Sequence, residues 1–120
     1  MNAVRVVNVR DVEPIELPQG SWSRMLVTKG RVEGNRACLG TSVFTPGTVL
    51  GDVCHETEEL AFVVAGSGEL RLDGETVPFA QGDALFVPPG VWHAVANTGA
   101  EDVVMVFGFA YPEYPPTERR

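Results

Sequence analysis

Apolar residues occur along this chain in short runs separated by turns rich in glycine and proline, a pattern that predicts strands rather than helices. Residues 21–29 alternate clearly, with Trp22, Arg24 and Leu26 on one face, so Arg24 is a candidate to point inward. Further strands are predicted over residues 4–9, 36–45, 60–65, 69–72, 75–78, 84–87, 91–96 and 102–111. So many short strands, with no long helical pattern, favour an all-β antiparallel barrel or jelly roll.

The segments between these strands carry signals of their own. Asp73-Gly74 predicts a type I′ hairpin turn, in which both central residues have positive φ. Residues 1–20 are expected to form an N-terminal strand and a surface connection, and residues 112–120 an extended or frayed proline-rich tail. The 120 residues are expected to form a single domain, because this length can bury one core but not two.

Composition and charge narrow the classes of partner. The chain is 44% hydrophobic and 21% charged, which is ordinary for a globular domain. A formal charge of −7, with Lys29 as the only lysine, argues against nucleic acid or an anionic membrane as the main partner. No apolar run approaches the ~20 residues that span a bilayer, and residues 1–10 lack a signal-peptide core, so a cytoplasmic location is expected.

The two cysteines, Cys38 and Cys54, are too few for a disulfide scaffold, and a reducing compartment would keep both as thiols. Cys38 is interpreted as a small buried hydrophobe rather than a nucleophile, because no histidine is free to activate it. Cys54 stands next to His55 and is expected to face the opposite side of its strand, which makes it a poor ligand.

The chain has only two histidines, and both lie among residues that suit a metal site. His55 is followed, across a Glu-Thr-Glu bend, by Glu59, whose carboxylate can fold back toward the imidazole. His93 follows a Pro-Pro-Gly turn that opens another strand. Imidazole and carboxylate ligands suit iron, zinc, manganese or nickel, so these three residues predict a site for one divalent metal ion.

The stretches around the two histidines resemble the two sequence motifs of the cupin family. The first motif, G-x5-H-x-H-x3-E-x6-G, is matched without a gap at Gly47, His55, Glu59 and Gly66. The second, G-x5-P-x-G-x2-H-x3-N, is matched at Gly82, Pro88, Gly90, His93 and Asn97. The resemblance implies an antiparallel cupin β-barrel, a double-stranded β-helix of the jelly-roll type.

The chain departs from the first motif at Val53, which stands where that motif has its first histidine. Val53 is expected to face the same way as His55 and so to leave one metal position open. Two histidines and one carboxylate with open positions is the ligand set of non-haem iron oxygenases. Among cupins, the ligand pattern resembles that of the iron-dependent hydroxypropylphosphonate epoxidase.

The substrate pocket is expected around Val53, Arg24, Ala61 and Val95. Arg36 and Arg71 are further candidates to bind an anionic substrate, although such residues are more often at the surface or in ion pairs. A homodimer is also expected, because a small barrel exposes sheet edges and an apolar outer face, with residues 4–9 as an interface strand.

Three functions remain open at this point. The leading expectation is an oxygenase or other oxidoreductase that uses Fe(II) to act on a small organic metabolite. The alternative enzyme is non-redox, an isomerase, cyclase, lyase or decarboxylase in which Zn, Mn or Ni acts as a Lewis acid. The third is a metabolite-binding cupin without turnover. A further alternative is a cupin that has lost its metal, in which His55 and His93 are hydrogen-bonded barrel residues without a metal-binding role.

Overall fold

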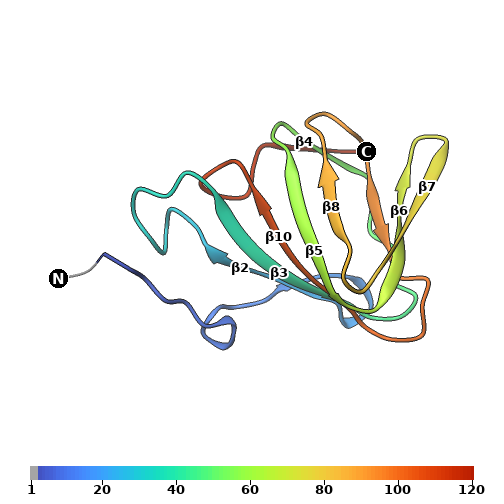
Figure 1. Ribbon diagram of the computed structural model, residues 1–120, viewed down its shortest axis with the longest axis horizontal. Helices are drawn as coiled ribbons and strands as arrows, with labels where there is room; N and C mark the ends of the chain where they lie inside the picture. Colours follow the sequence, from blue (N-terminus) through green and yellow to red (C-terminus); the bar gives the residue numbers. More distant parts are fainter. Residues whose placement is uncertain (1–2) are drawn as a thin grey trace.

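The structure, a computed structural model, describes residues 3–120 and is built from antiparallel strands arranged in two layers (Figure 1). In chain order the strands are β1 (Ile15–Glu16), β2 (Trp22–Val27), β3 (Cys38–Phe44), β4 (Val53–His55), β5 (Glu59–Ala65), β6 (Ser67–Leu72), β7 (Glu75–Ala80), β8 (Ala84–Val87), β9 (Ala94–Ala96), β10 (Val103–Phe109) and β11 (Thr117–Arg119). Two short 3-10 helices, η1 (Val9–Asp11) and η2 (Pro18–Gly20), precede β2. The predicted all-β antiparallel fold is confirmed.

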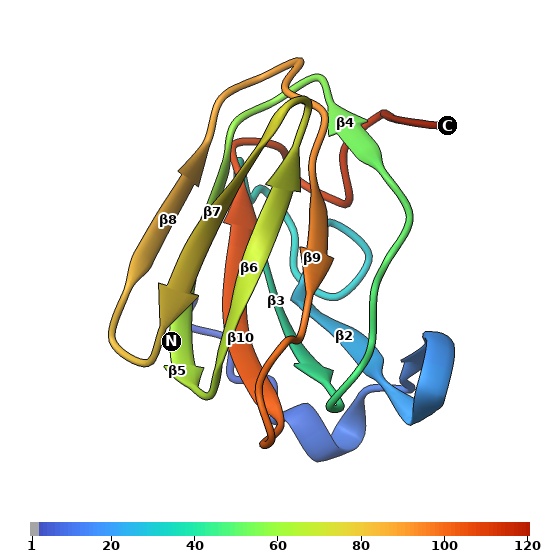
Figure 2. The ribbon, with the colours of Figure 1, turned by 90° about the vertical axis from the view of Figure 1, so that its right-hand side faces the viewer.

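The first layer is a six-stranded sheet in the order β1-β2-β3-β10-β5-β8. The second layer begins with the sheet β7-β6-β9 and continues through backbone pairing of Val49 with Ala96 and of Val53 with His93. This pairing brings in β4, whose other neighbour is β11. Figure 2 shows β7, β6, β9 and β4 following one another across this layer.

The core lies between the layers because successive strand residues face opposite sides of a sheet. Along β10, Val103, Met105, Phe107 and Phe109 are buried, whereas the residues between them are partly exposed. Phe44 from β3 packs in the same cluster. Burying side chains of this size stabilises the fold by roughly 1.5–3 kcal/mol each relative to leaving them in water.

Two residues of the recognised motifs shape turns. Gly66 joins β5 to β6 with a φ of 85°, and a Cβ there would collide with the backbone of Asp102. Asn97 donates hydrogen bonds of 2.8 Å to the carbonyl oxygens of Phe44 and Glu101 and accepts one of 2.9 Å from the Gly99 amide. Asn97 therefore ties the chain after β9 to the end of β3.

Several local expectations were wrong. Residues 4–9 form no strand, and the position beside β2 is taken by β1, from the predicted connection. Valine-rich sequence favours a strand only where a partner strand is available. Residues 73–74 do connect a hairpin, but only Gly74 has positive φ, so the turn is not type I′. Of the extended or frayed tail predicted over residues 112–120, the extended alternative holds at Thr117–Arg119, because these residues form β11 and pair with β4.

Both cysteines are free thiols. Cys38 is buried, and its Sγ donates a hydrogen bond of 3.3 Å to the Glu113 carbonyl oxygen. Burial raises the pKa of Cys38 above its ordinary value, which disfavours the reactive thiolate. This agrees with its interpretation as a buried hydrophobe.

Within residues 3–120, no helix is long and apolar enough to cross a membrane. The two 3-10 helices have three residues each. A cytoplasmic location stays a prediction from the sequence.

Candidate metal centre

The three residues predicted to bind a metal come together from three separate segments. His55 ends β4, Glu59 begins β5, and His93 lies just before β9. Glu59 Oε1 is 3.4 Å from His55 Nε2 and 3.3 Å from His93 Nε2. One donor atom from each residue lies within 4.8 Å of the other two. Because Glu59 belongs to the first layer and both histidines to the second, the cluster joins the layers.

Backbone hydrogen bonds place the two histidines side by side. The amide of each of Val53 and His93 donates to the carbonyl oxygen of the other, at 2.9 Å in both directions. The Gly90 amide donates to the His55 carbonyl oxygen, also at 2.9 Å. Gly90 has a φ of 77°, a left-handed conformation that suits glycine, so the Pro-Pro-Gly turn sets the separation of the rings. The ring centroids are 5.2 Å apart.

The Nδ1 atom of each histidine has a partner on the side away from Glu59. His93 Nδ1 lies 2.9 Å from the Val91 carbonyl oxygen, and His55 Nδ1 lies 2.7 Å from Thr117 Oγ1. A carbonyl oxygen only accepts hydrogen bonds, so His93 keeps a proton on Nδ1 and, when neutral, presents the lone pair of Nε2 to Glu59. A lone pair that faces a carboxylate favours a cation between them.

Burial makes the charges in this cluster consequential, since both histidines are only 4% exposed. Burial alone would raise the pKa of Glu59, but the hydrogen bonds that the rings of His55 and His93 donate when protonated outweigh it and hold that pKa below its ordinary value. Burial would likewise lower the pKa of His93, but its hydrogen bond with the Glu59 carboxylate outweighs burial. The pKa of His93 therefore lies above its ordinary value. The site therefore stabilises a carboxylate and favours positive charge beside it.

These donors fit a divalent transition metal. Two imidazole nitrogens and one carboxylate oxygen suit zinc, iron, manganese or nickel and do not select one of them. Three protein ligands leave positions for water or substrate, as in catalytic rather than structural zinc sites. Both rings are held by a partner at the second nitrogen, which is usual for metal-binding histidines.

The three residues line a cavity of about 530 Å³ between the layers. Of the predicted pocket residues, Val53, Ala61 and Val95 also line it. The remaining wall is mostly apolar and includes Leu17, Met25, Phe44, Leu50, Leu70, Leu85, Val87, Met105, Phe107 and Phe109. Such a wall suits an apolar or aromatic small molecule.

Arg24 does not line this cavity, so its expected inward orientation is corrected. β2 instead contributes Ser23 and Met25 to the wall, and the Arg24 guanidinium lies 4.5 Å from the Trp22 ring centroid. Alternation along a strand distinguishes two faces but not which one is inward. Arg36 and Arg71, the other anion-binding candidates, are exposed and also lie outside the cavity wall.

Sequence reasoning missed the contribution of the C-terminal segment. Tyr114 and Arg119 line the cavity, and the Tyr114 ring packs edge-on against His55 and Phe109 at centroid distances of 5.6 and 5.4 Å. Burial raises the pKa of Tyr114 above its ordinary value, so its hydroxyl stays protonated. An aromatic residue between stiff prolines was the available signal that this tail packs against the body.

Comparison with known proteins identifies the family. The sequence profile of the cupin domain matches residues 40–109, more than half of the chain and a range that includes both motifs. The chain therefore belongs to the cupin family, as the motifs predicted.

Among its relatives, the chain is 35% identical over 104 residues to polyketide synthase CurC of Streptomyces cyaneus, covering 86% of this chain and 67% of CurC. It is 33% identical over 67 residues to a gentisate 1,2-dioxygenase of Ralstonia sp., covering 55% of this chain and 19% of that enzyme. The solved structure of the polyketide cyclase RemF from Streptomyces resistomycificus superposes with a TM-score of 0.81. That match covers 97% of this chain and 84% of RemF, and at 22% identity it demonstrates the shared fold alone.

Proposed function

We propose that this protein is a metal-dependent, non-redox cupin enzyme that cyclises a small carbonyl-bearing molecule of the polyketide type. The observation that carries this proposal is the convergence of His55, Glu59 and His93 on an apolar cavity. The similarity to CurC, a polyketide synthase protein, supports a substrate of the polyketide type and so favours this class over an oxygenase, because it extends over 86% of the chain against 55% for the gentisate dioxygenase. The ligand pattern favoured an Fe(II) oxygenase over a non-redox enzyme, and we now place the non-redox enzyme first.

The residues around the cluster suit this chemistry. A divalent metal held by His55, Glu59 and His93 would act as a Lewis acid that polarises a substrate carbonyl. Val53 leaves room beside the ligands for a substrate oxygen. The apolar wall would hold the chain of the substrate folded, so that its reacting carbons meet and water is excluded. A volume of about 530 Å³ falls within the roughly 300–1,000 Å³ of small-molecule sites.

An Fe(II) oxygenase is the second candidate. Two histidines and one carboxylate form the ligand set of non-haem iron oxygenases, and the gentisate 1,2-dioxygenase is among the relatives of this chain. Its substrate would enter the same cavity, and its reaction would consume oxygen. Oxygen uptake therefore separates the two enzyme classes.

The test begins with metal analysis of protein purified under low oxygen. The protein is then loaded with Zn, Mn, Ni or Fe(II) and incubated with a short poly-β-ketone, while products are followed by mass spectrometry and oxygen by an electrode. We expect a cyclised product that has lost water, with no oxygen uptake and no product from the His93→Ala variant. An oxidised product formed with oxygen uptake would favour the oxygenase, and saturable binding without product would favour a metabolite-binding protein.

A homodimer is proposed as the assembly. On the outer face of the first layer, Leu60, Phe62, Val64 and Phe86 are each between 44% and 61% exposed. Strand register places Leu60 beside Phe86, and Phe62 beside Val106, so these side chains form one uncharged patch. For a chain with a formal charge of −7, an uncharged face allows two copies to approach with the least repulsion.

A further inference from the structure

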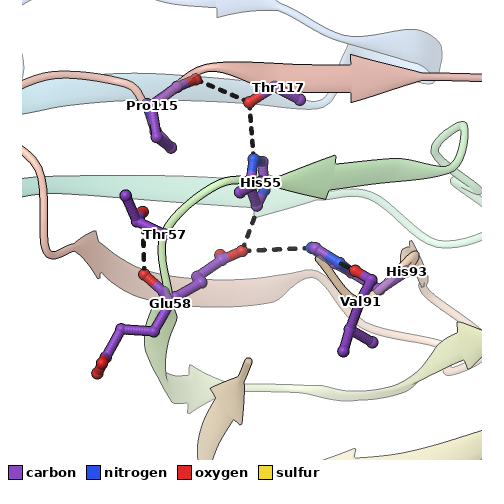
Figure 3. A network of polar contacts seen from close by, with 8 residues as sticks. His55, Thr57, Glu58, Val91, His93, Pro115 and Thr117 are labelled. Carbon is purple, nitrogen blue, oxygen red and sulfur yellow. Dashed lines mark hydrogen bonds and ion pairs between the residues drawn. The ribbon is translucent and has the colours of Figure 1, made fainter. Parts of the chain in front are cut away.

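Thr117 links the C-terminal segment directly to the candidate metal centre. It begins β11 and is the backbone partner of His55 in the pairing of β11 with β4. Its Oγ1 lies 2.7 Å from His55 Nδ1 and 2.8 Å from the Pro115 carbonyl oxygen (Figure 3). The Thr117 hydroxyl therefore contacts the His55 ring and, at the same time, a carbonyl oxygen that can only accept a hydrogen bond.

Counting protons decides the direction of both hydrogen bonds. A threonine hydroxyl has one proton to donate and two lone pairs that accept, whereas a carbonyl oxygen can only accept. The Thr117 hydroxyl therefore donates its hydrogen bond to the Pro115 carbonyl oxygen, and Thr117 Oγ1 accepts a hydrogen bond from His55 Nδ1. A neutral His55 then carries its proton on Nδ1, and the lone pair of its Nε2 faces Glu59 Oε1 at 3.4 Å.

We propose that Thr117 is a positioning residue that holds His55 in the tautomer competent to bind the metal. Without its hydroxyl, a neutral His55 would gain by placing its proton on Nε2 and donating it to the Glu59 carboxylate. That tautomer has no lone pair at the metal position. The importance of Thr117 for activity rests on the proposed metal-dependent function, but the tautomer is a property of the protein itself.

The segment that carries Thr117 is fixed on both sides of it. The Glu56 amide donates to the Pro116 carbonyl oxygen at 3.1 Å. At the end of the segment, Arg120 Nε lies 3.3 Å from Asp52 Oδ2, and its guanidinium lies 4.4 Å from the Trp92 ring centroid. The hydroxyl is thus held in place by backbone pairing and side-chain contacts, as orienting a ring requires.

The test uses the fact that the chain contains only two histidines. Proton–nitrogen correlation spectra of the imidazole rings report which nitrogen carries the proton, and His93→Ala assigns the two signals. Spectra are recorded for metal-free protein at a pH high enough to leave both rings neutral. The variants are Thr117→Val, which removes the hydroxyl, and Thr117→Ser, which keeps it. Thr76→Val is the matched control at an exposed strand position.

We expect native His55 to be protonated at Nδ1, and Thr117→Val to move that proton to Nε2 while His93 is unchanged. Zn²⁺ affinity of Thr117→Val should fall by roughly 10–100-fold, the usual effect of losing an outer partner of a metal-binding histidine. Thr117→Ser and Thr76→Val should behave like the native protein. Thr117→Ala provides a second hydroxyl-free variant if Thr117→Val does not fold.

Protonation of native His55 at Nε2 would overturn the inference, as would a hydroxyl-free variant with unchanged tautomer and unchanged Zn²⁺ affinity. The proposed function fails separately. If the native protein bound no metal yet held His55 protonated at Nδ1, the metal-dependent function would be lost and the role of Thr117 in setting the tautomer would stand.

Discussion

His55 and His93 belong to the same cluster, but their rings are held by different kinds of partner. His93 Nδ1 contacts a backbone carbonyl two residues earlier in the chain, whereas His55 Nδ1 contacts a side-chain hydroxyl 62 residues later. The first partner is present whatever side chain stands at that position. The second is present only when β11 has paired with β4 and residue 117 carries a hydroxyl. A side-chain substitution can therefore remove the partner of His55 Nδ1, but it cannot remove the carbonyl oxygen that contacts His93 Nδ1.

Removing either imidazole ring tests the role that the two histidines share, which is to bind the metal. We expect His93→Ala to abolish tight binding of divalent metal, because it removes one of three ligands, and His55→Ala to do the same. The loss should exceed the roughly 10–100-fold that follows from losing an outer partner. Calorimetric titration with Zn²⁺ measures it, and thermal melts show whether the barrel survives. Stoichiometric metal retained by either variant would reject the site.

Val53→His adds a ligand on the His55 side of the cluster. Val53 lines the cavity two residues before His55 on the same strand, so the new imidazole should reach the open metal position. We expect metal affinity to rise on the order of tenfold and turnover to fall, because the added ligand occupies a position that substrate needs. Val53→Ala is the control that changes the side chain without adding a ligand. Weaker or unchanged metal binding by Val53→His would contradict the idea of a vacated ligand position.

Val91→Ala tests the backbone support of His93. The acceptor is the carbonyl oxygen of Val91, which the substitution retains. Metal affinity should change by less than about threefold, in contrast to Thr117→Val. Because Val91 is partly buried against the core, the free energy of unfolding should fall by about 1 kcal/mol. A tenfold loss of Zn²⁺ affinity in a folded Val91→Ala protein would mean that this support does depend on the side chain.

Phe62→Glu, on the outer face, should leave both histidines unaffected. Phe62 is 48% exposed and lies on the face of β5 opposite the cavity. We expect the substitution to convert a dimer to a monomer in analytical ultracentrifugation while Zn²⁺ affinity stays unchanged, because it places a charge in the apolar patch. Thr76→Glu, which adds the same charge at an exposed position of the second layer opposite Arg71, is the control and should keep the native mass. A monomeric native protein at micromolar concentration would count against the dimer.

Much of the candidate site was predictable because its signals are local. Short stretches of sequence contain both the spacing of His55 and Glu59 and the Pro-Pro-Gly turn before His93. Gly66 acts within its own turn, where backbone conformation depends on the residue itself. Asn97 accepts a hydrogen bond from the nearby Gly99 amide, although it also donates one to the distant Phe44 carbonyl oxygen. Local requirements of this kind identify the fold and the ligand types without knowledge of any distant contact.

The errors share a physical cause. Arg24 was given the wrong direction because alternation has the same period whichever face is buried. Residues 4–9 were given a strand because valine favours strands, although pairing requires a free neighbouring edge. The prolines of residues 112–120 predict a tail that is extended or frayed but do not predict its pairing, because its partner β4 lies far away in the sequence.

Short stretches of sequence predicted the three candidate ligands, and their resemblance to the cupin motifs implied the barrel and the missing fourth ligand at Val53. The packing of the folded chain established which side chains form the cavity wall and brought Tyr114 and Thr117 to His55. Contacts between residues so distant in the chain depend on how strands pair and layers pack. The hydroxyl that orients one histidine thus comes from a segment that carries no motif.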